Sequence, residues 1–199
     1  PLGVIANNTK FFAGTLTADA SDKAARFLQL CDAFGLPVLS LVDTPGFIVG
    51  PKHEATALVR RASRLLVAGA ALGVPLIAVV LRRGYGLGAQ AMVAGSLHEP
   101  LLTIAWPSAH LGPMGLEGAV KLGFRKELEQ IADERERDEK IRELTRLAEE
   151  NAKALNAATL FELDDVIDPA ETRTLIAATF AAAELPERPT RGHRFVDTW

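Results

Sequence analysis

Residues 81–92, Leu-Arg-Arg-Gly-Tyr-Gly-Leu-Gly-Ala-Gln-Ala-Met, place three glycines between an apolar segment and a segment of small residues. The preceding run, residues 76–81, is typical of a buried strand, and the small residues that follow favour a helix. Glycines at such a junction allow a sharp turn and leave backbone N–H groups open to a cleft. These groups can stabilise an oxygen atom that gains negative charge. The sequence therefore predicts an oxyanion-binding turn.

A second junction of the same kind lies upstream. Residues 38–43 form an apolar, strand-like run, and Thr44-Pro45-Gly46-Phe47 breaks it before another amphipathic segment. Helical periodicity covers residues 19–34 and 54–72. The first segment ends at Gly35, with Pro37 two residues later, and the second ends at Gly73, with Pro75 two residues later. This alternation predicts an α/β fold, a parallel sheet with covering helices. Both turns then lie at the carboxyl ends of strands, where we expect one cleft.

Weaker patterns complete the chain. Further strands are expected at residues 2–6, 11–16 and 101–106, the first two as a hairpin or adjacent pair. Residues 133–140 are all charged, with mixed sign, which indicates either a solvated helix or a docking surface for another subunit. Asp168-Pro169-Ala170-Glu171 predicts a helix start with a carboxylate cap. The tail, residues 185–199, is expected on the surface or on a partner.

Composition limits the class of protein. The chain has 199 residues, 48% hydrophobic and 24% charged, which suits one domain with a sizeable core. A net charge of −3 gives no reason to expect binding to nucleic acid or to an anionic membrane. A single cysteine, Cys31, excludes an intrachain disulfide, and neither a bilayer-spanning run nor a secretory signal is visible. We therefore expect a cytoplasmic protein. The start on an apolar run without methionine suggests a longer polypeptide whose N-terminal half is missing here.

Three further motifs follow the two turns. They are Ala105-Trp106-Pro107, Met114-Gly115-Leu116-Glu117-Gly118-Ala119 and Asp164-Asp165-Val166-Ile167-Asp168-Pro169. In this order and spacing, the motifs resemble the second half of the carboxyltransferase (beta-type) subunit of biotin-dependent acyl-CoA carboxylases. The resemblance runs from Gly3 to about Ala183.

The resemblance implies a crotonase-like (ClpP/crotonase) fold, with residues 1–199 forming a single C-terminal domain. It implies transfer of a carboxyl group from carboxybiotin to the α carbon of an acyl-CoA thioester, with this half supplying the biotin side of the site. Biotin is the implied cofactor, attached to a carrier protein and not to this chain. The implied partners are the acyl-CoA substrate and the biotin carboxyl carrier and biotin carboxylase subunits, in a homo-oligomer.

The resemblance also places the functional residues. The family's Tyr-Gly-Gly-Ala turn falls on Tyr85, Gly86, Leu87 and Gly88, whose N–H groups would hold the ureido oxygen of biotin. The chain departs from that pattern because leucine, which resists φ > 0, replaces the second glycine, and Gly88 replaces the alanine. The donor is then either Leu87 or Gly88. The other implied binding residues are Ala89, Gln90, Asp43, Pro45, Gly46, Phe47, Met114 and Gly115.

Several roles stay open at this stage. Asp43 belongs either to the wall of the cleft or to a tight turn that it caps. Leu87 and Gln90 are candidates for acyl-chain selection, and Glu117 is expected to be structural. No protein general base is required, because in the resembling family the ureido nitrogen of biotin takes the substrate proton.

Other kinds of site fit the sequence poorly. The histidines lack the spacing of a zinc site, so no metal is expected. There is no GxSxG elbow, and the glycine spacing matches neither GxGxxG nor a P-loop. Basic and aromatic residues do not interleave as a nucleic-acid surface requires. Two alternatives remain: a biotin-dependent acyl-CoA decarboxylase subunit, and a noncatalytic half-domain that serves only subunit assembly.

Overall fold

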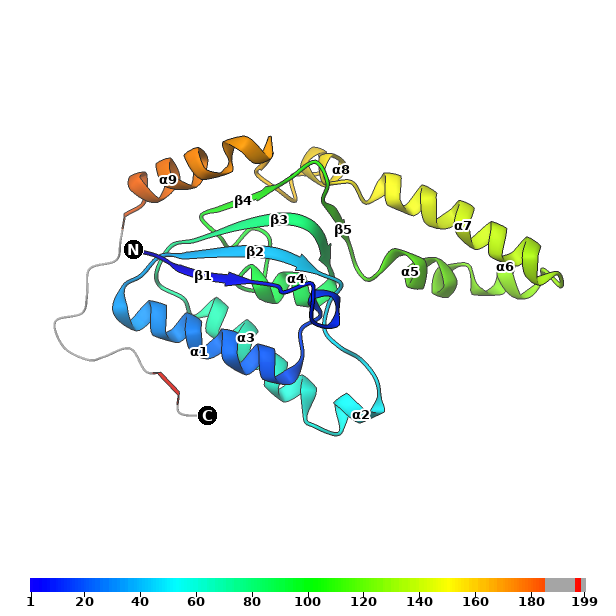
Figure 1. The fold of residues 1–199 in the computed structure, drawn as a ribbon, viewed down its shortest axis with the longest axis horizontal. Coiled ribbons are helices and arrows are strands. Elements are labelled where there is room, and N and C mark those ends of the chain that lie inside the picture. The colour runs from blue at the N-terminus through cyan, green and yellow to red at the C-terminus, as the bar shows by residue number, and fades with distance from the viewer. Residues whose placement is uncertain (185–195, 198–199) are drawn as a thin grey trace.

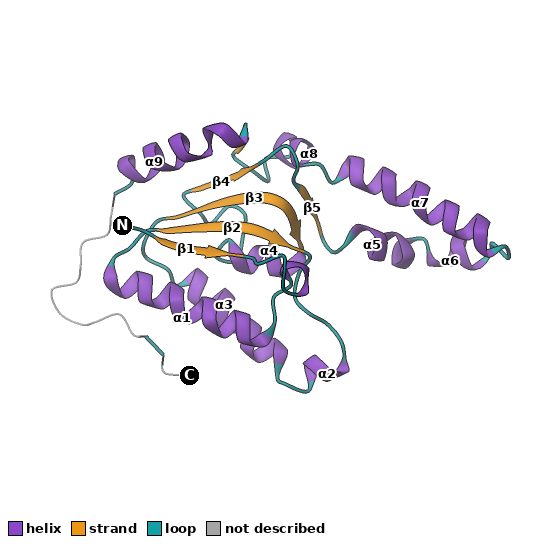
Figure 2. Cartoon of the chain, in the orientation of Figure 1, coloured by secondary structure: helices purple, strands orange, loops and turns teal. Residues whose placement is uncertain are grey.

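The computed structural model of the chain describes residues 1–184 and 196–197. The strands are β1 Gly3–Ala6, β2 Val38–Thr44, β3 Leu76–Tyr85, β4 Leu102–Ala105, β5 His110–Gly112 and β6 Asp165–Val166. The α-helices are α1 Ala18–Phe34, α2 Pro51–Glu54, α3 Leu58–Ala70, α4 Gly86–Met92, α5 Leu116–Gly123, α6 Arg125–Glu129, α7 Glu134–Asn151, α8 Ala154–Thr159 and α9 Thr172–Ala182. Two short 3-10 helices are η1 Phe12–Gly14 and η2 Pro169–Glu171. Figure 2 shows how strands and helices alternate through the first half of the chain.

The strands form one parallel sheet, as the sequence predicts. Its order is β1-β2-β3-β4-β6, and β5 pairs with the carboxyl-terminal part of β3. The long strands β2 and β3 lie in the middle of the sheet (Figure 1). All carboxyl ends therefore face the same edge, which is where ligands bind in open α/β sheets.

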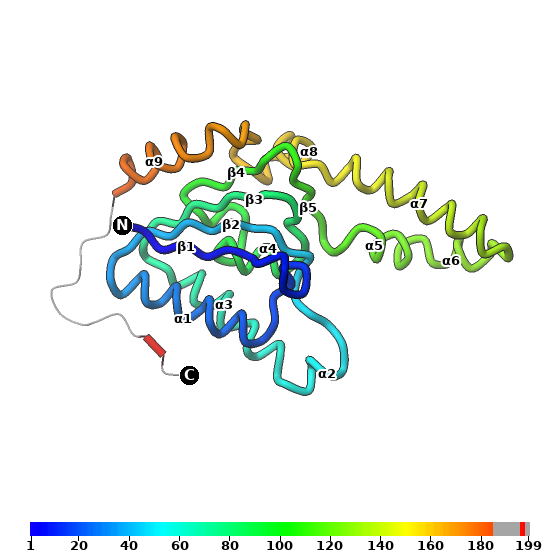
Figure 3. Tube along the Cα trace, in the orientation of Figure 1, coloured from blue at the N-terminus to red at the C-terminus, as the bar shows by residue number. Residues whose placement is uncertain are grey.

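Helices cover the sheet from two sides. Successive residues of β3 point to opposite faces: Ala78 and Val80 join the core formed with α1, α3 and α4, whereas Ile77 and Val79 pack with Ile176 of α9. Figure 3 shows α1 and α3 running side by side on one side of the sheet, with α9 on the other. Burial on both faces explains why the β3 sequence is continuously apolar instead of alternating.

The segment from α5 to α7 forms an arm that extends away from the sheet (Figure 3). No residue of α7 is buried. Asp133 caps this helix, because its Oδ1 atom accepts a hydrogen bond from the Arg135 amide at 2.8 Å. The charged run 133–140 is therefore an exposed cap and helix, and a docking role for it remains a prediction.

Some local expectations are confirmed and others are wrong. Cys31 is 1% exposed, and burial raises the pKa of its thiol. The Asp168 carboxylate caps η2 by accepting the Ala170 amide at 2.8 Å. The expected helix 54–72 is divided into α2 and α3, because Ala57 adopts a left-handed φ of 57°. Most of the tail 185–199 lies outside the described residues.

The strand expected at residues 11–16 does not form. Phe12 and Ala13 have φ values of 44° and 55°, which are incompatible with an extended strand. Local hydrogen bonds stabilise the 3-10 turn instead: the Gly14 amide donates to the Phe11 carbonyl at 2.8 Å, and the Thr15 hydroxyl donates to the Phe12 carbonyl at 2.6 Å. Leu16 keeps only an isolated bridge to Phe47.

Candidate active site

The two glycine-bearing turns lie side by side at the carboxyl ends of β2 and β3. These strands are parallel neighbours, and Thr44 is in register with Gly84. Gly88 packs directly on Gly46, since a Cβ atom at residue 88 would lie 2.7 Å from the Gly46 Cα atom. The backbones of the two turns are therefore in contact.

The left-handed residue of the β3 turn is Gly86, not Leu87. Gly86 has φ = 59°, and a Cβ atom there would lie 2.7 Å from the carbonyl oxygen of Pro113. Glycine is thus required at residue 86 by conformation and by space. Leu87 does not have a positive φ, so this departure from the family's pattern causes no backbone strain and leaves the Leu87 amide in place.

The first turn of α4 begins without a cap. Its N-cap residue, Tyr85, makes no side-chain capping hydrogen bond. The amides of Leu87 and Gly88 precede the first intrahelical bond, and outside the helices and strands no backbone acceptor for them occurs within residues 1–184 and 196–197. The Leu87 side chain is 63% exposed, so this end of α4 lies at the surface. Leu87 and Gly88 thus provide two adjacent backbone amides at this helix start, with Leu87 exposed and Gly88 buried.

The Asp43 carboxylate forms ion pairs with two arginines, Arg82 and Arg83. Its Oδ2 atom accepts a hydrogen bond from Arg82 Nε at 3.1 Å, and its Oδ1 atom accepts one from Arg83 Nε at 3.0 Å. The Asp43 amide also donates to the side-chain oxygen of Asn7 at 3.0 Å. The carboxylate is mostly buried and joins the ends of β2 and β3. This geometry favours a structural role for Asp43 over a place in the wall of the cleft. The carboxylate acts through ion pairs and not as the expected cap of a tight turn.

The rest of the β2 turn is held by backbone contacts. The Gly46 amide donates to the hydroxyl oxygen of Thr44 at 3.1 Å. The Gly46 carbonyl accepts the Leu16 amide at 3.0 Å, and the partly buried Phe47 ring packs against the core. Pro45 is also partly buried. Gly46 therefore brings the backbone close to Gly88, while Phe47 contributes mainly to packing.

Two supporting residues were not expected from the sequence. The buried Ser40 hydroxyl donates to the Met92 carbonyl at 2.6 Å and so ties α4 to β2. The Thr44 hydroxyl, also fully buried, organises the Pro-Gly turn. Both are polar residues inside an apolar strand, and this interruption is the signal that would have identified them, because buried hydroxyls require partners.

Tyr85, the last residue of β3, is buried beside the turn. Its side chain is 6% exposed and lies against Gly112 of β5. Burial raises the pKa of the Tyr85 phenol, an effect that the nearby Arg83 partly opposes. The phenol is therefore neutral at physiological pH and acts as a packing group.

A hollow of about 340 Å³ opens beside the β3 turn. Gly86, Ala89 and Gln90 line one side, and β5 with the junction of α7 and α8 lines the other. The Gln90 side chain is exposed at its edge. Of the sequence-predicted residues, the structure thus places these three at a hollow. It leaves the other nine outside the lining: Asp43, Pro45, Gly46, Phe47, Tyr85, Leu87, Gly88, Met114 and Gly115.

The segment after β5 contributes the helix start of α5. Gly115 is its N-cap residue, and Met114 is 40% exposed. Glu117 forms an exposed ion pair with Lys121 at 2.5 Å, one helical turn away. The hydrogen bond from Lys121 lowers the pKa of Glu117. An exposed, ion-paired carboxylate with a lowered pKa is a poor general base.

Residues 1–184 and 196–197 contain no group of three or more His, Cys, Asp or Glu side chains that could hold a metal ion. Over the same residues, no helix has both the length and the apolar character needed to cross a membrane.

Comparison with known proteins gives a consistent result. The family model of the carboxyl transferase domain matches residues 1–196. The methylmalonyl-CoA carboxyltransferase 12S subunit of Propionibacterium freudenreichii subsp. shermanii is 40% identical over 199 residues, which cover 96% of this chain and 36% of the relative. This chain spans about a third of the length of the curated relatives it matches.

Solved structures agree with the fold. A single-chain, multi-domain long-chain acyl-CoA carboxylase is 51% identical, with a TM-score of 0.81 over 90% of this chain and 18% of that chain. The transcarboxylase 12S structure, described as a hexamer assembly with methylmalonyl-coenzyme A bound, is 36% identical, with a TM-score of 0.82 over 99% of this chain and 38% of that chain. The expected crotonase-like α/β fold is confirmed by these similarities.

Proposed function

The chain belongs to the family of carboxyl transferase domains, and from this premise we propose that it forms the biotin side of a carboxyltransferase active site. A carboxyl group passes from carboxybiotin on a carrier protein to the α carbon of an acyl-CoA. Because the chain spans only about a third of its relatives' length, we place the acyl-CoA side outside residues 1–199. In this proposal residues 1–199 are a single C-terminal domain of the complete enzyme.

The observation that carries the proposal is the pair of adjacent amides, Leu87 and Gly88, at the uncapped turn after β3. Bound carboxybiotin would supply the carboxyl group for the α carbon of the acyl-CoA and, once its N–C bond is broken, a ureido nitrogen that can take up the α proton. The amides of Leu87 and Gly88 would hold the ureido oxygen by donating hydrogen bonds to it and would stabilise the negative charge that increases there. This fits the residues present, since the donors are fixed by the backbone and need no reorganisation.

The other residues position this turn. Gly46 and Gly88 allow the two backbones to touch, and Gly86 allows the left-handed turn that starts α4. Ala89 and Gln90 line the adjacent hollow, where they contribute to substrate selection. Tyr85 supports the turn by packing. We assign no general base to the chain.

Partners and location belong to the same proposal. We propose biotin carboxyl carrier and biotin carboxylase subunits as partners, acyl-CoA as the substrate, a homo-oligomeric assembly, and a cytoplasmic location. The hexamer described for the transcarboxylase 12S structure supports the oligomer. The unpartnered amides favour a catalytic role over a noncatalytic half-domain, because assembly alone does not require them.

Binding of free biotin to the ¹⁵N-labelled chain tests the site. We expect chemical-shift changes centred on the Leu87 and Gly88 amides, and shifts elsewhere or none at saturating biotin would contradict the assignment. Transfer is then measured with a carboxybiotinylated carrier, acyl-CoAs and a carboxyltransferase that contains this domain. Net formation or net consumption of the carboxylated acyl-CoA distinguishes a carboxylase from a decarboxylase.

A further inference from the structure

Strand β2 carries a hydroxyl group where its sequence is otherwise apolar. Ser40 lies in the middle of the run Val38-Leu39-Ser40-Leu41-Val42, and its side chain is fully buried. The hydroxyl donates a hydrogen bond of 2.6 Å to the carbonyl oxygen of Met92, the last residue of α4. A buried hydroxyl costs free energy unless it is hydrogen-bonded. The bond to Met92 is therefore what allows a serine at this place in the core.

The Met92 carbonyl in turn requires a partner. The last four carbonyl groups of a helix have no intrahelical donor. The chain turns sharply after α4, where Ala94 and Gly95 have φ values of 61° and 104°, and the Gly95 amide closes the turn by donating to the Gln90 carbonyl at 2.7 Å. Met92 is 2% exposed, so its carbonyl has little access to water. Ser40 therefore satisfies a buried carbonyl and fixes the C-terminal end of α4 to β2.

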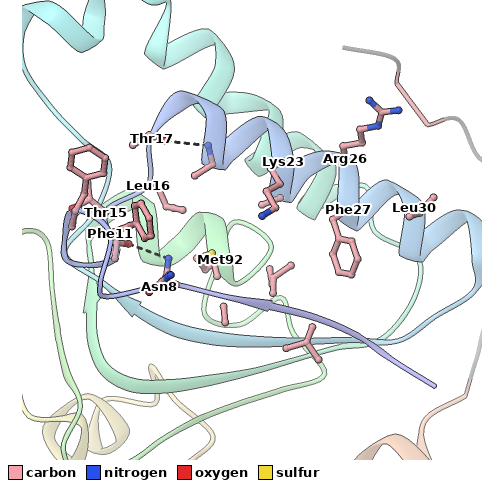
Figure 4. Close-up of a pocket in the computed structure, with 18 of the residues that line it drawn as sticks. Asn8, Phe11, Thr15, Leu16, Thr17, Lys23, Arg26, Phe27, Leu30 and Met92 are labelled. Atoms are coloured by element: carbon pink, nitrogen blue, oxygen red, sulfur yellow. Dashed lines mark hydrogen bonds between the residues drawn. The ribbon is translucent and has the colours of Figure 1, made fainter.

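The side chain of Met92 gives this end of α4 a second support. It lines an apolar groove of about 840 Å³ between β1 and α1, together with Leu16 and Phe27 (Figure 4). The same side chain belongs to the core on this face of the sheet. The C-terminal end of α4 is thus held by one polar contact, from Ser40, and by apolar packing.

The opposite end of α4 rests on the turn that follows β2. A Cβ atom at residue 88 would lie 2.7 Å from the Gly46 Cα atom, so the backbones of Gly88 and Gly46 are in contact. Helix α4 has seven residues and a length of only about 10 Å. In a close-packed interior, a displacement at Met92 is passed along so short a helix to Leu87 and Gly88.

We propose that Ser40 is a positioning residue of the carboxyltransferase site: its hydroxyl sets the place of α4 and, through α4, the place of the Leu87 and Gly88 amides. This inference rests on the proposed function, which gives those two amides their role. Donors in such a site must lie within about 0.5 Å of their productive position. Because Ser40 is fully buried, it acts through α4 and not by contact with a substrate.

Ser21 provides a matched control. Its side chain is also fully buried, and its hydroxyl donates to a backbone carbonyl, that of Thr17, at 2.8 Å. This bond lies at the start of α1 and does not involve α4. Ser40→Ala and Ser21→Ala therefore each remove one buried hydroxyl that is bonded to a carbonyl, but only Ser40→Ala releases α4.

The first measurement follows the amides in ¹⁵N spectra of the full chain, without biotin. We expect Ser40→Ala to shift the Leu87 and Gly88 amides and Ser21→Ala to leave them at their wild-type positions. If Ser40→Ala does not fold, Ser40→Cys takes its place, because a thiol has a similar size and is only a weak donor. Wild-type positions of both amides in the Ser40 variant overturn the proposal.

The second measurement is transfer from a carboxybiotinylated carrier to acyl-CoA, in an enzyme that contains this domain and below the unfolding temperature of each variant. Ser40→Ala should lower kcat about 10 to 100-fold, the effect of a small misplacement of reacting groups, with the KM for acyl-CoA changed less than about twofold. Ser21→Ala should keep kcat within about twofold of the wild type. Equal kcat values for the two variants, or a rise in KM without a fall in kcat, overturn the proposal.

Failure of this inference is distinguishable from failure of the proposed function. If biotin shifts the Leu87 and Gly88 amides of the wild type but Ser40→Ala leaves them in place, only the role of Ser40 is wrong. If Ser40→Ala displaces the amides but biotin does not affect them in the wild type, the proposed function is wrong and Ser40 has no part in carboxyl transfer.

Discussion

Removal of the Leu87 N–H group is the most direct perturbation of the proposed site. Leu87→leucic acid replaces that amide by an ester and keeps the side chain. The Leu87 amide has no intrahelical acceptor, and the side chain is 63% exposed, so the folded state loses no internal hydrogen bond of this donor. Stability should therefore change little. The matched control is the hydroxy-acid analogue at Val59, the second residue of α3, which is 72% exposed and occupies the same helical position.

The expected effect on catalysis is large. Loss of one oxyanion donor raises the barrier by about 3 to 4 kcal/mol, which lowers kcat by about 10² to 10³-fold. Because the charge on the ureido oxygen increases only during transfer, the affinity for biotin should fall much less than kcat. The assay measures transfer from a carboxybiotinylated carrier to acyl-CoA in an enzyme that contains this domain, together with thermal unfolding. Leu87→Ala, which retains the amide, should keep nearly full kcat.

A clear result would refute this reasoning. If the ester at Leu87 and the ester at Val59 give the same kcat, the Leu87 amide is not a transition-state donor. If Leu87→Ala loses as much activity as the ester, the side chain and not the backbone is responsible. An ester at Leu87 that lowers the midpoint of unfolding more than the ester at Val59 does would indicate that the Leu87 amide has an internal partner.

Three further predictions test the surroundings of the turn. Gly88→Ala should lower the free energy of unfolding by roughly 1 to 3 kcal/mol, measured by denaturant unfolding, because the new Cβ atom meets the backbone of the facing turn. The control, Gly123→Ala, should leave the free energy of unfolding unchanged, since a Cβ atom there meets nothing within 4 Å. Asp43→Asn should lower the free energy of unfolding by about 1 to 3 kcal/mol, because it removes the mostly buried carboxylate that pairs with Arg82 and Arg83. The loss is limited because Arg82 is about half exposed and its ion pair is screened by solvent. The control, Asp19→Asn, should cause no measurable change, since the Asp19 side chain is 89% exposed. The pKa of Tyr85 is raised in the folded state, so the folded protein holds the phenol proton more tightly than the unfolded chain does. The contribution of the phenol to stability is therefore fully present below its unfolded pKa of about 10 and is lost as the pH rises through its folded pKa. At alkaline pH, the free energy of unfolding should therefore fall more steeply with pH for the wild type than for Tyr85→Phe. Equal slopes for the two proteins would show that the Tyr85 phenol does not contribute to the pH dependence of stability.

The position of the candidate site followed from the sequence because it depends on local patterns. Two apolar runs that end in glycine-rich turns, each followed by a helix, are enough to place both turns at one edge of a parallel sheet. The identity of the donor did not follow. Gly86, and not Leu87, takes the left-handed conformation, and the Pro113 carbonyl from a distant segment leaves no room for a Cβ atom at residue 86. The two arginines that bind Asp43 are likewise adjacent to it only in the folded chain.

The sequence by itself determined the β-α alternation, the parallel sheet and the family resemblance, because hydrophobic periodicity and glycine positions act over short distances along the chain. The tertiary structure alone decided the contact of Gly88 with Gly46, the burial of Ser40 and Thr44, and the 3-10 turn at residues 12–14. It also decided that an apolar groove lies between β1 and α1. These features arise where segments far apart in sequence pack together, and close packing selects among local conformations that have similar intrinsic energies.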